Sequence, residues 1–108
     1  MPEQITVTEL ARRLAAAEPT VLVDVRQDWE HATAALANDI LIPLHEIEER
    51  WSEIEAPAGA LIVTYCHHGV RSLGAAGFLE AQGLAPVRSL AGGIDAWSLE
   101  IDPTLPRY

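Results

Sequence analysis

The chain has 108 residues and a formal charge of −9 at neutral pH, with seven arginines and no lysine. Hydrophobic residues make up 49% and charged residues 21%, which is typical of one globular domain over residues 1–108. The acidic balance argues against nonspecific nucleic-acid binding, because that needs a basic surface. We also expect no membrane partner, because no apolar run resembles a membrane span or a secretory signal. A lone cysteine cannot form an internal disulfide, so we expect a reducing, cytoplasmic location.

Apolar runs, which predict strands, alternate along the chain with stretches that carry apolar residues on one helical face. In the first half we expect a strand at 5–7, a helix from the N-cap Thr8 to before Pro19, a strand at 21–25, a helix at 28–37, a strand at 40–42 and an acidic helix at 45–54. In the second half we expect a strand at 61–65, a helix at 73–81 followed by Gly83, a strand at 86–90 and a helix from Gly92-Gly93 to about Leu99. This alternation predicts an α/β fold with three layers, α/β/α, around a mainly parallel five-stranded sheet.

Cys66 lies where the apolar strand at 61–65 gives way to a short loop that contains Gly69. Ligands of parallel sheets bind at the carboxyl ends of the strands, which is where Cys66 is expected. Backbone N–H groups of the loop and of the helix start converge there and favour an anion. We therefore expect Cys66 to act as a thiolate nucleophile.

The pattern Cys-x-x-Gly-x-Arg-Ser over residues 66–72 resembles the active-site loop of rhodanese-type sulfurtransferases. Three further elements match that family in the right order: Asp24-Val25-Arg26 followed by Glu30, then Ile42-Pro43-Leu44, then Gly92-Gly93-Ile94-Asp95-Ala96-Trp97. The family's usual Gly-His-Ile is replaced here by Ala34-Ala35-Leu36, with the spacing kept. The resemblance spans nearly the whole chain and implies a single rhodanese-like domain.

This resemblance implies a double-displacement sulfur transfer that uses no cofactor. The Cys66 thiolate takes the sulfane sulfur of a small anionic donor such as thiosulfate, and a thiol or cyanide acceptor removes it from the resulting persulfide. A sulfur-relay module is the alternative, passing sulfur to an acceptor protein for tRNA thiolation or cofactor biosynthesis. Residues 102–108 resemble the end of rhodanese domains fused to enzymes that activate ubiquitin-like sulfur carriers, which favours the relay.

A cysteine phosphatase or arsenate reductase is a weaker alternative. Phosphatases with cysteine on a similar loop place one more residue between Cys and Arg, enough to circle a phosphate. Here four residues, His67 to Val70, separate Cys66 from Arg71. The shorter loop suits one sulfur atom better than a phosphate.

We expect the substrate site to be formed by the loop residues His67, His68, Gly69, Val70, Arg71 and Ser72. Gly69 permits a nest of N–H groups. Arg71 is expected to brace the loop through carbonyls or a carboxylate, or to contact an anionic donor. Ser72 would hydrogen-bond the sulfur or cap the helix. The two histidines are expected at the rim of the site, where they supply positive charge or recognise a donor.

Asp24, Arg26 and Glu30 are expected to support this loop. Asp24 and Arg26 end the second predicted strand, on the rim of the sheet that carries Cys66. A carboxylate at the end of a buried strand needs a partner, and Arg71 or the loop N–H groups are the candidates for Asp24. Glu30 is the other candidate partner of Arg71.

Acidic residues are unevenly distributed. Five glutamates crowd residues 46–55, whereas residues 56–79 contain no Asp or Glu. A small anion can therefore approach Cys66 although the chain as a whole is acidic. The alternative is that a buried strand and a packed helix simply exclude carboxylates.

We expect no metal. The possible ligands lack the regular spacing of a four-ligand zinc site: Cys66, His67, His68, His31 and His45. The tryptophans are expected as core or groove anchors rather than as groups that stack on substrate: Trp29, Trp51 and Trp97.

Overall fold

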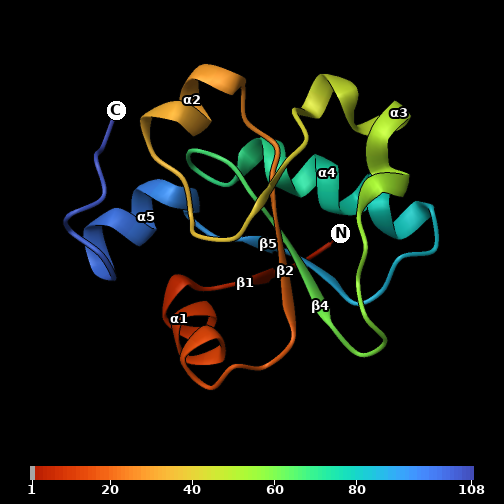
Figure 1. The fold of residues 1–108 in the computed structure, drawn as a ribbon, viewed down its shortest axis with the longest axis horizontal. Helices are drawn as coiled ribbons and strands as arrows, with labels where there is room; N and C mark the ends of the chain where they lie inside the picture. Colours follow the sequence, from red (N-terminus) through yellow and green to blue (C-terminus); the bar gives the residue numbers. More distant parts are fainter. Residues whose placement is uncertain (1) are drawn as a thin grey trace.

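The computed structural model describes residues 2–108 and confirms the predicted α/β fold. Five parallel strands form one sheet in the order β1-β5-β4-β2-β3 (Figure 1). Their bounds are Glu3–Ile5 for β1, Thr20–Asp24 for β2, Ile40–Leu41 for β3, Leu61–Tyr65 for β4 and Val87–Leu90 for β5. The central strand β4 is buried along its whole length, so its carboxyl end delivers Cys66 to the middle of one sheet edge.

Helices cover both faces of the sheet and give the three layers (Figure 1). Their bounds are Val7–Ala15 for α1, Asp28–Thr33 for α2, Ile47–Arg50 for α3, Val70–Ala81 for α4 and Gly93–Glu100 for α5. The helices α1 and α5 pack together over one face, while α3 and α4 cover the other. None of these helices, within the described residues 2–108, is long and apolar enough to cross a membrane.

Successive side chains of β4 enter opposite cores. Leu61, Val63 and Tyr65 join the core beneath α1 and α5, while Ile62 and Cys66 join the core beneath α4. A strand that is buried on both faces needs apolar residues at every position, which is why the sequence runs without alternation there. The sulfur therefore enters the layer that holds the start of α4.

The first helix begins earlier than the sequence predicted. Thr6, not Thr8, is the N-cap, because its backbone is extended and its Oγ1 accepts the N–H of Glu9 at 3.1 Å. The strand β1 consequently ends at Ile5. Val7, assigned to the predicted strand, is buried on α1 instead.

Two predicted helices are shorter in the structure. The helix predicted at 28–37 ends at Thr33, because Ala34 is extended and both Ala34 and Leu36 are buried in the core beneath α1 and α5. The helix predicted at 45–54 is divided into the 3₁₀ turn η1 (Leu44–Glu46), the helix α3 and the 3₁₀ turn η2 (Trp51–Glu53).

The helix after Cys66 begins at Val70, three residues before the predicted start. Its N-cap is Gly69, whose φ of 99° lies in the left-handed region that glycine tolerates. Arg71 and Ser72 therefore lie in the first turn of α4, where backbone N–H groups have no partner within the helix. These free N–H groups are available to the sulfur.

The helix α5 meets the Cys66 loop backbone to backbone. It begins at the turn Gly92-Gly93, where φ is 76° and 62°. The N–H of Ile94 donates to the carbonyl oxygen of Cys66 at 2.9 Å, and the N–H of Asp95 donates to that of His67 at 3.1 Å. A Cβ on Gly93 would overlap both carbonyl oxygens, so this approach requires glycine.

We expect Gly93→Ala to lower the free energy of unfolding by about 2–4 kcal/mol, because the added Cβ must displace the loop from α5 and the φ is unfavourable for alanine. Gly74→Ala is the matched control, because Gly74 lies inside α4 and a Cβ there would meet no atom within 4 Å. The control should raise stability by about 0.5–1 kcal/mol. Urea denaturation measures both changes, and a Gly93→Ala protein as stable as the wild type would contradict the close contact of α5 with the loop.

Candidate active site

Two backbone N–H groups converge on the sulfur of Cys66. The N–H of Gly69 donates to Sγ at 3.1 Å and the N–H of Ser72 donates at 3.4 Å. The Ser72 hydroxyl oxygen lies 3.5 Å from Sγ, and Cys66 as a whole is 1% exposed. This arrangement suits a negatively charged sulfur, because the donors are fixed before any charge arrives.

Ser72 is held in place from the sheet side. Its Oγ lies 2.7 Å from Oγ of Ser89 on β5, and its carbonyl accepts the Thr64 hydroxyl at 2.8 Å. Ser72 lies inside α4, so its side chain contacts the sulfur rather than capping the helix. Ser89 and Thr64 were not predicted from the sequence. The available signal was a hydroxyl residue within each of the neighbouring strands β4 and β5.

Arg71 forms a bidentate ion pair with Glu30 of α2. The distances are 2.7 Å from Nη1 to Oε1 and 2.9 Å from Nη2 to Oε2. The guanidinium holds the pKa of Glu30 down at about 2, aided by hydrogen bonds from Tyr108 and from the N–H of Gln27. Of the partners expected for Arg71, the structure therefore shows the carboxylate. Glu30 also brings a negative charge to a loop whose own sequence is free of acidic residues, so Arg71 is neutralised.

Asp24 pairs with Arg26, and the predicted partners Arg71 and the loop N–H groups are wrong. The distances are 2.8 Å from Nη2 to Oδ2 and 2.9 Å from Nε to Oδ1, and both side chains are fully buried. Further guanidinium donors reach the carbonyl oxygens of Ala34 at 2.5 Å and Glu30 at 3.3 Å. Asp24 pairs with Arg26 because the two residues are close in sequence and because the planar guanidinium matches the geometry of the carboxylate.

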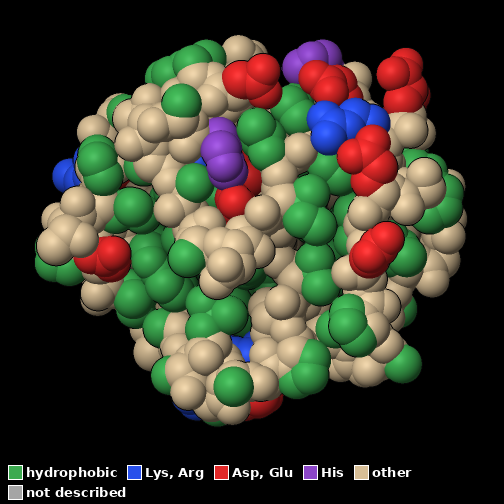
Figure 2. Space-filling view, viewed as in Figure 1, with side chains coloured by type: hydrophobic (Ala, Val, Ile, Leu, Met, Phe, Trp, Pro, Cys, Tyr) green, Lys and Arg blue, Asp and Glu red, His purple; other side chains and the backbone are tan. Residues whose placement is uncertain are grey.

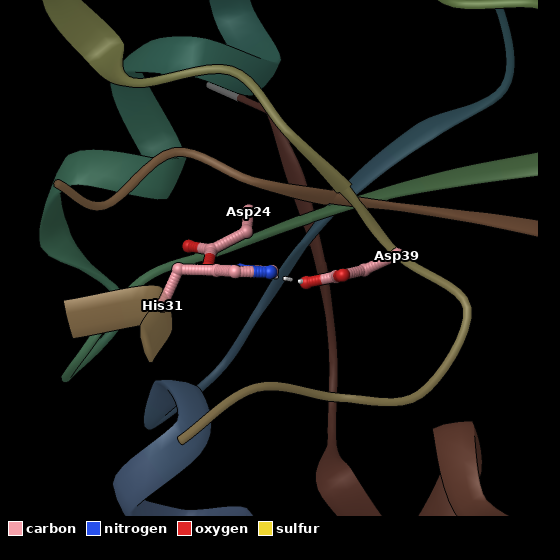
Figure 3. A group of neighbouring side chains, drawn as sticks. All are labelled: Asp24, His31 and Asp39. Carbon is pink, nitrogen blue, oxygen red and sulfur yellow. Dashed lines mark hydrogen bonds and ion pairs between the residues drawn. The ribbon is translucent and has the colours of Figure 1, made fainter. Parts of the chain in front are cut away.

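His31 extends this buried ion pair (Figure 3). Its Nδ1 lies 2.9 Å from Oδ2 of Asp24 and 3.5 Å from Oδ2 of Asp39. Burial raises the pKa of Asp39, which also accepts a hydrogen bond from the Tyr65 hydroxyl. His31, Asp24 and Asp39 are the three side chains of ligand type that lie within 4.8 Å of one another in residues 2–108. Since Asp24 already carries the guanidinium of Arg26, which repels cations, we interpret this group as an ion-pair cluster rather than a metal site.

The rings of the two loop histidines stack on one another. The ring of His67 lies between those of His68 and Tyr108, with centroids 3.9 Å away on each side. Burial, and to a smaller extent the neighbouring His68, lower the pKa of His67, so its ring holds a positive charge less readily than an ordinary histidine. Its Nε2 is buried with no hydrogen-bond partner among the described residues.

Tyr108 is a further residue of the site that was not predicted from the sequence. Its hydroxyl donates to Oε2 of Glu30 at 2.7 Å and accepts from Nη1 of Arg26 at 2.9 Å. It thereby joins the two ion pairs of the site. A single tyrosine near the end of a proline-containing tail gives no local signal. The one available hint was the resemblance of residues 102–108 to the ends of other rhodanese domains.

The three tryptophans occupy different surroundings. Trp29 is 59% exposed and meets Tyr108 edge to face, with centroids 5.6 Å apart, so a core position was wrong for this residue. Trp51 and Trp97 are partly buried and pack against the cores on opposite faces of the sheet. None of these contacts tests a role in substrate binding.

Two hollows and one acidic region mark the surface. A hollow of roughly 260 Å³ opens beside Arg71 and is lined also by Val25, Gln27, Leu44 and His45. A larger one of roughly 470 Å³ has apolar walls between α1, α5 and residues 35–38, where Figure 2 shows exposed apolar side chains. We associate the smaller hollow with the site, because Arg71 belongs to the Cys66 loop.

Acidic side chains gather over α3 and the adjoining turns (Figure 2, upper right), where Arg50 pairs with Glu46 and Glu53.

Glu30→Gln should destabilise the protein by roughly 2 kcal/mol at pH 7, a figure that allows for solvent screening at the partly exposed Arg71. The folded pKa of Glu30, about 2, lies below the ordinary value of 4.5. The stabilisation is therefore complete above pH 4.5 and is lost as the pH falls through 2. Urea denaturation at several pH values should show the wild type and the variant converging as the solution is acidified. A constant difference down to the lowest pH would mean that the ion pair is not its source.

Known proteins resemble this chain along nearly its whole length. Residues 6–100 match the family model described as "Rhodanese-like domain". A protein of Allochromatium vinosum named "Sulfurtransferase" is 39% identical over 98 residues, which cover 91% of this chain and 90% of that protein. The Zea mays protein "Adenylyltransferase and sulfurtransferase MOCS3-2" is 31% identical over 115 residues. That match covers all of this chain but 24% of the maize protein.

The fold is also similar to solved structures. A crystal structure of a rhodanese-like domain protein from Staphylococcus aureus superposes with a TM-score of 0.81. It is 31% identical in sequence, and the match covers 98% of each chain. The family match and these relatives cover nearly the whole chain, and the chain belongs to the rhodanese-like domain family.

Proposed function

We propose that this chain is a sulfurtransferase that carries sulfane sulfur as a persulfide on Cys66. The observation that carries the proposal is the pair of N–H groups, from Gly69 and Ser72, at 3.1 and 3.4 Å from Sγ. A thiolate and a persulfide are both anions, and neutral N–H dipoles stabilise either form without a metal or cofactor. The relatives named sulfurtransferase support the same chemistry.

The reaction has two displacements. In the first, the Cys66 thiolate attacks the sulfane sulfur of a small anionic donor such as thiosulfate. The new S–S bond forms as the donor's S–S bond breaks, and sulfite leaves with the electron pair. In the second, an acceptor thiolate or cyanide attacks the outer sulfur of the persulfide, and Cys66 leaves as a thiolate that the loop N–H groups stabilise.

The surrounding residues have supporting roles in this proposal. The loop His67–Ser72 supplies the N–H donors to the sulfur. Glu30 holds Arg71 by an ion pair. The buried ion pair of Asp24 and Arg26 lies at the end of β2. The hollow beside Arg71 has room for a small anionic donor. Its lining combines the apolar Val25 and Leu44 with the polar Gln27, His45 and Arg71.

A sulfur relay to an acceptor protein is the second candidate, as used for tRNA thiolation or cofactor biosynthesis. It is favoured by the similarity of the whole chain to one part of the maize protein, whose name joins sulfurtransferase with adenylyltransferase. Protein acceptors and small thiols share the chemistry at Cys66. The two candidate functions differ in whether a small thiol or a protein acceptor removes the outer sulfur of the persulfide faster.

Incubation with thiosulfate, followed by intact-mass measurement, should show a gain of one sulfur atom in the wild type. Cys66→Ser should show no gain, since it removes the only thiol while keeping nearly the same side-chain shape. Adding a small thiol or cyanide should reverse the gain. Absence of any mass gain with thiosulfate and other sulfane donors would overturn the proposed function, as would aryl phosphatase turnover that matches sulfur transfer.

We expect Arg71→Lys to slow sulfur uptake by roughly tenfold or more, because lysine lacks the planar fork that grips both oxygens of Glu30. Arg88→Lys is the matched control, because Arg88 forms exposed pairs with Glu3 and Glu9 on the sheet edge. The initial rate of mass gain measures the effect. Equal rates for the wild type and both variants would remove Arg71 from the site.

A further inference from the structure

The side chain of Tyr108 is tied to the site from a distant part of the chain. It is hydrogen-bonded to Arg26 and Glu30, which precede it by 82 and 78 residues. Its ring also packs on Trp29 and His67. The sulfur-transfer chemistry proposed for Cys66 assigns no part to Tyr108.

The hydroxyl of Tyr108 acts on the end of the loop. It donates to Oε2 of Glu30, the same oxygen that accepts Nη2 of Arg71 at 2.9 Å. It also gives Arg26 Nη1 its shorter hydrogen bond, 2.9 Å against 3.3 Å to the carbonyl of Glu30. Without this hydroxyl, Glu30 and Arg26 each lose a charge-assisted partner in a region with little access to water. The orientation of Arg71 therefore depends on Tyr108 through Glu30.

The ring of Tyr108 acts on the start of the loop. It lies on His67 at a centroid distance of 3.9 Å and an interplanar angle of 10°. With His68 stacked on the imidazole as well, the ring of His67 is enclosed between two aromatic rings, and its Nε2 is buried without a hydrogen-bond partner. Burying a nitrogen without a hydrogen-bond partner costs free energy. We therefore expect His67 to stay buried only while its ring is stacked on Tyr108 and His68.

We propose that Tyr108 is a positioning residue for the Cys66 loop, whose ring fixes His67 at the start and whose hydroxyl fixes Arg71 at the end through Glu30. Between these points lies Gly69, the nearer of the two N–H donors to the sulfur. The consequence for sulfur transfer rests on the proposed function, whereas the positioning itself is a property of the folded chain.

Tyr108→Phe tests the hydroxyl while keeping the ring. Amide hydrogen exchange, followed by NMR, should become about tenfold faster at Gly69 and Ser72, because their contacts with the sulfur loosen. The amides of β4 should keep their wild-type rates. A merely structural role would lower protection throughout β4 as well, so the comparison separates local positioning from general destabilisation.

Tyr108→Ala tests the ring. Its removal exposes His67, so the pKa of His67, measured by NMR titration, should rise toward the ordinary value of 6.5. In Tyr108→Phe that pKa should stay low. Thr104→Ala is the matched control, because Thr104 is exposed on the same segment and hydrogen-bonds to Asp102. It should leave the loop amides and the His67 titration unchanged.

The rate of sulfur uptake from thiosulfate completes the test, and we expect it to fall about tenfold in Tyr108→Phe and further in Tyr108→Ala. Loop amides as protected as in the wild type, or protection lost equally in β4, would overturn the positioning role. Faster exchange at Gly69 and Ser72 combined with a wild-type rate of sulfur uptake would show that positioning by Tyr108 does not matter for sulfur transfer. A wild-type protein that takes up no sulfur would instead overturn the proposed function, while the exchange and titration results would still decide the role of Tyr108.

Discussion

The geometry around the sulfur depends on one backbone contact, between the first turn of α5 and the Cys66 loop. The N–H groups of Ile94 and Asp95 donate hydrogen bonds to the carbonyl oxygens of Cys66 and His67. These two hydrogen bonds fix the main chain of Cys66 and His67, directly before the loop turns to its donor Gly69. The side chain of Val70 is 77% exposed, so the position of Val70 does not depend on packing of its side chain.

Burial of charge is the second constraint, and it organises the segment after α2. Arg26 is fully buried, and its guanidinium reaches the carbonyl oxygen of Ala34 as well as Asp24. The Tyr65 hydroxyl accepts the N–H of Leu36 at 3.1 Å, which fixes the same segment from β4. These bonds go to the main chain of Ala34-Ala35-Leu36, where related domains usually carry Gly-His-Ile. The backbone there is therefore held by groups that do not depend on the replaced side chains.

The sequence was sufficient for the four strands after the first and for the place of Cys66 at the end of β4. An apolar run of five residues such as Leu61–Tyr65, followed by a glycine-containing loop, fits a buried parallel strand and little else. Helix ends were less predictable, because the choice between Thr6 and Thr8 as N-cap depends on backbone geometry rather than residue type. The choice of ion-pair partners was least predictable. Arg71 was a candidate partner for both Asp24 and Glu30, and the folded chain pairs it with Glu30 while Arg26 takes Asp24.

The order of the strands has a consequence for how the protein is made. β1 pairs in parallel with β5, so that Glu3 lies opposite Arg88. The carbonyls of Cys66 and His67 likewise find their hydrogen-bond partners in residues 94 and 95. On a ribosome, the first strand and the cysteine loop therefore emerge long before the segments that complete them. Such distant pairings slow folding, because the chain entropy of closing a long loop is lost before any contact is gained. The two hydrogen bonds that hold the Cys66 loop to α5 are thus absent from the nascent chain until residues 94 and 95 have been made.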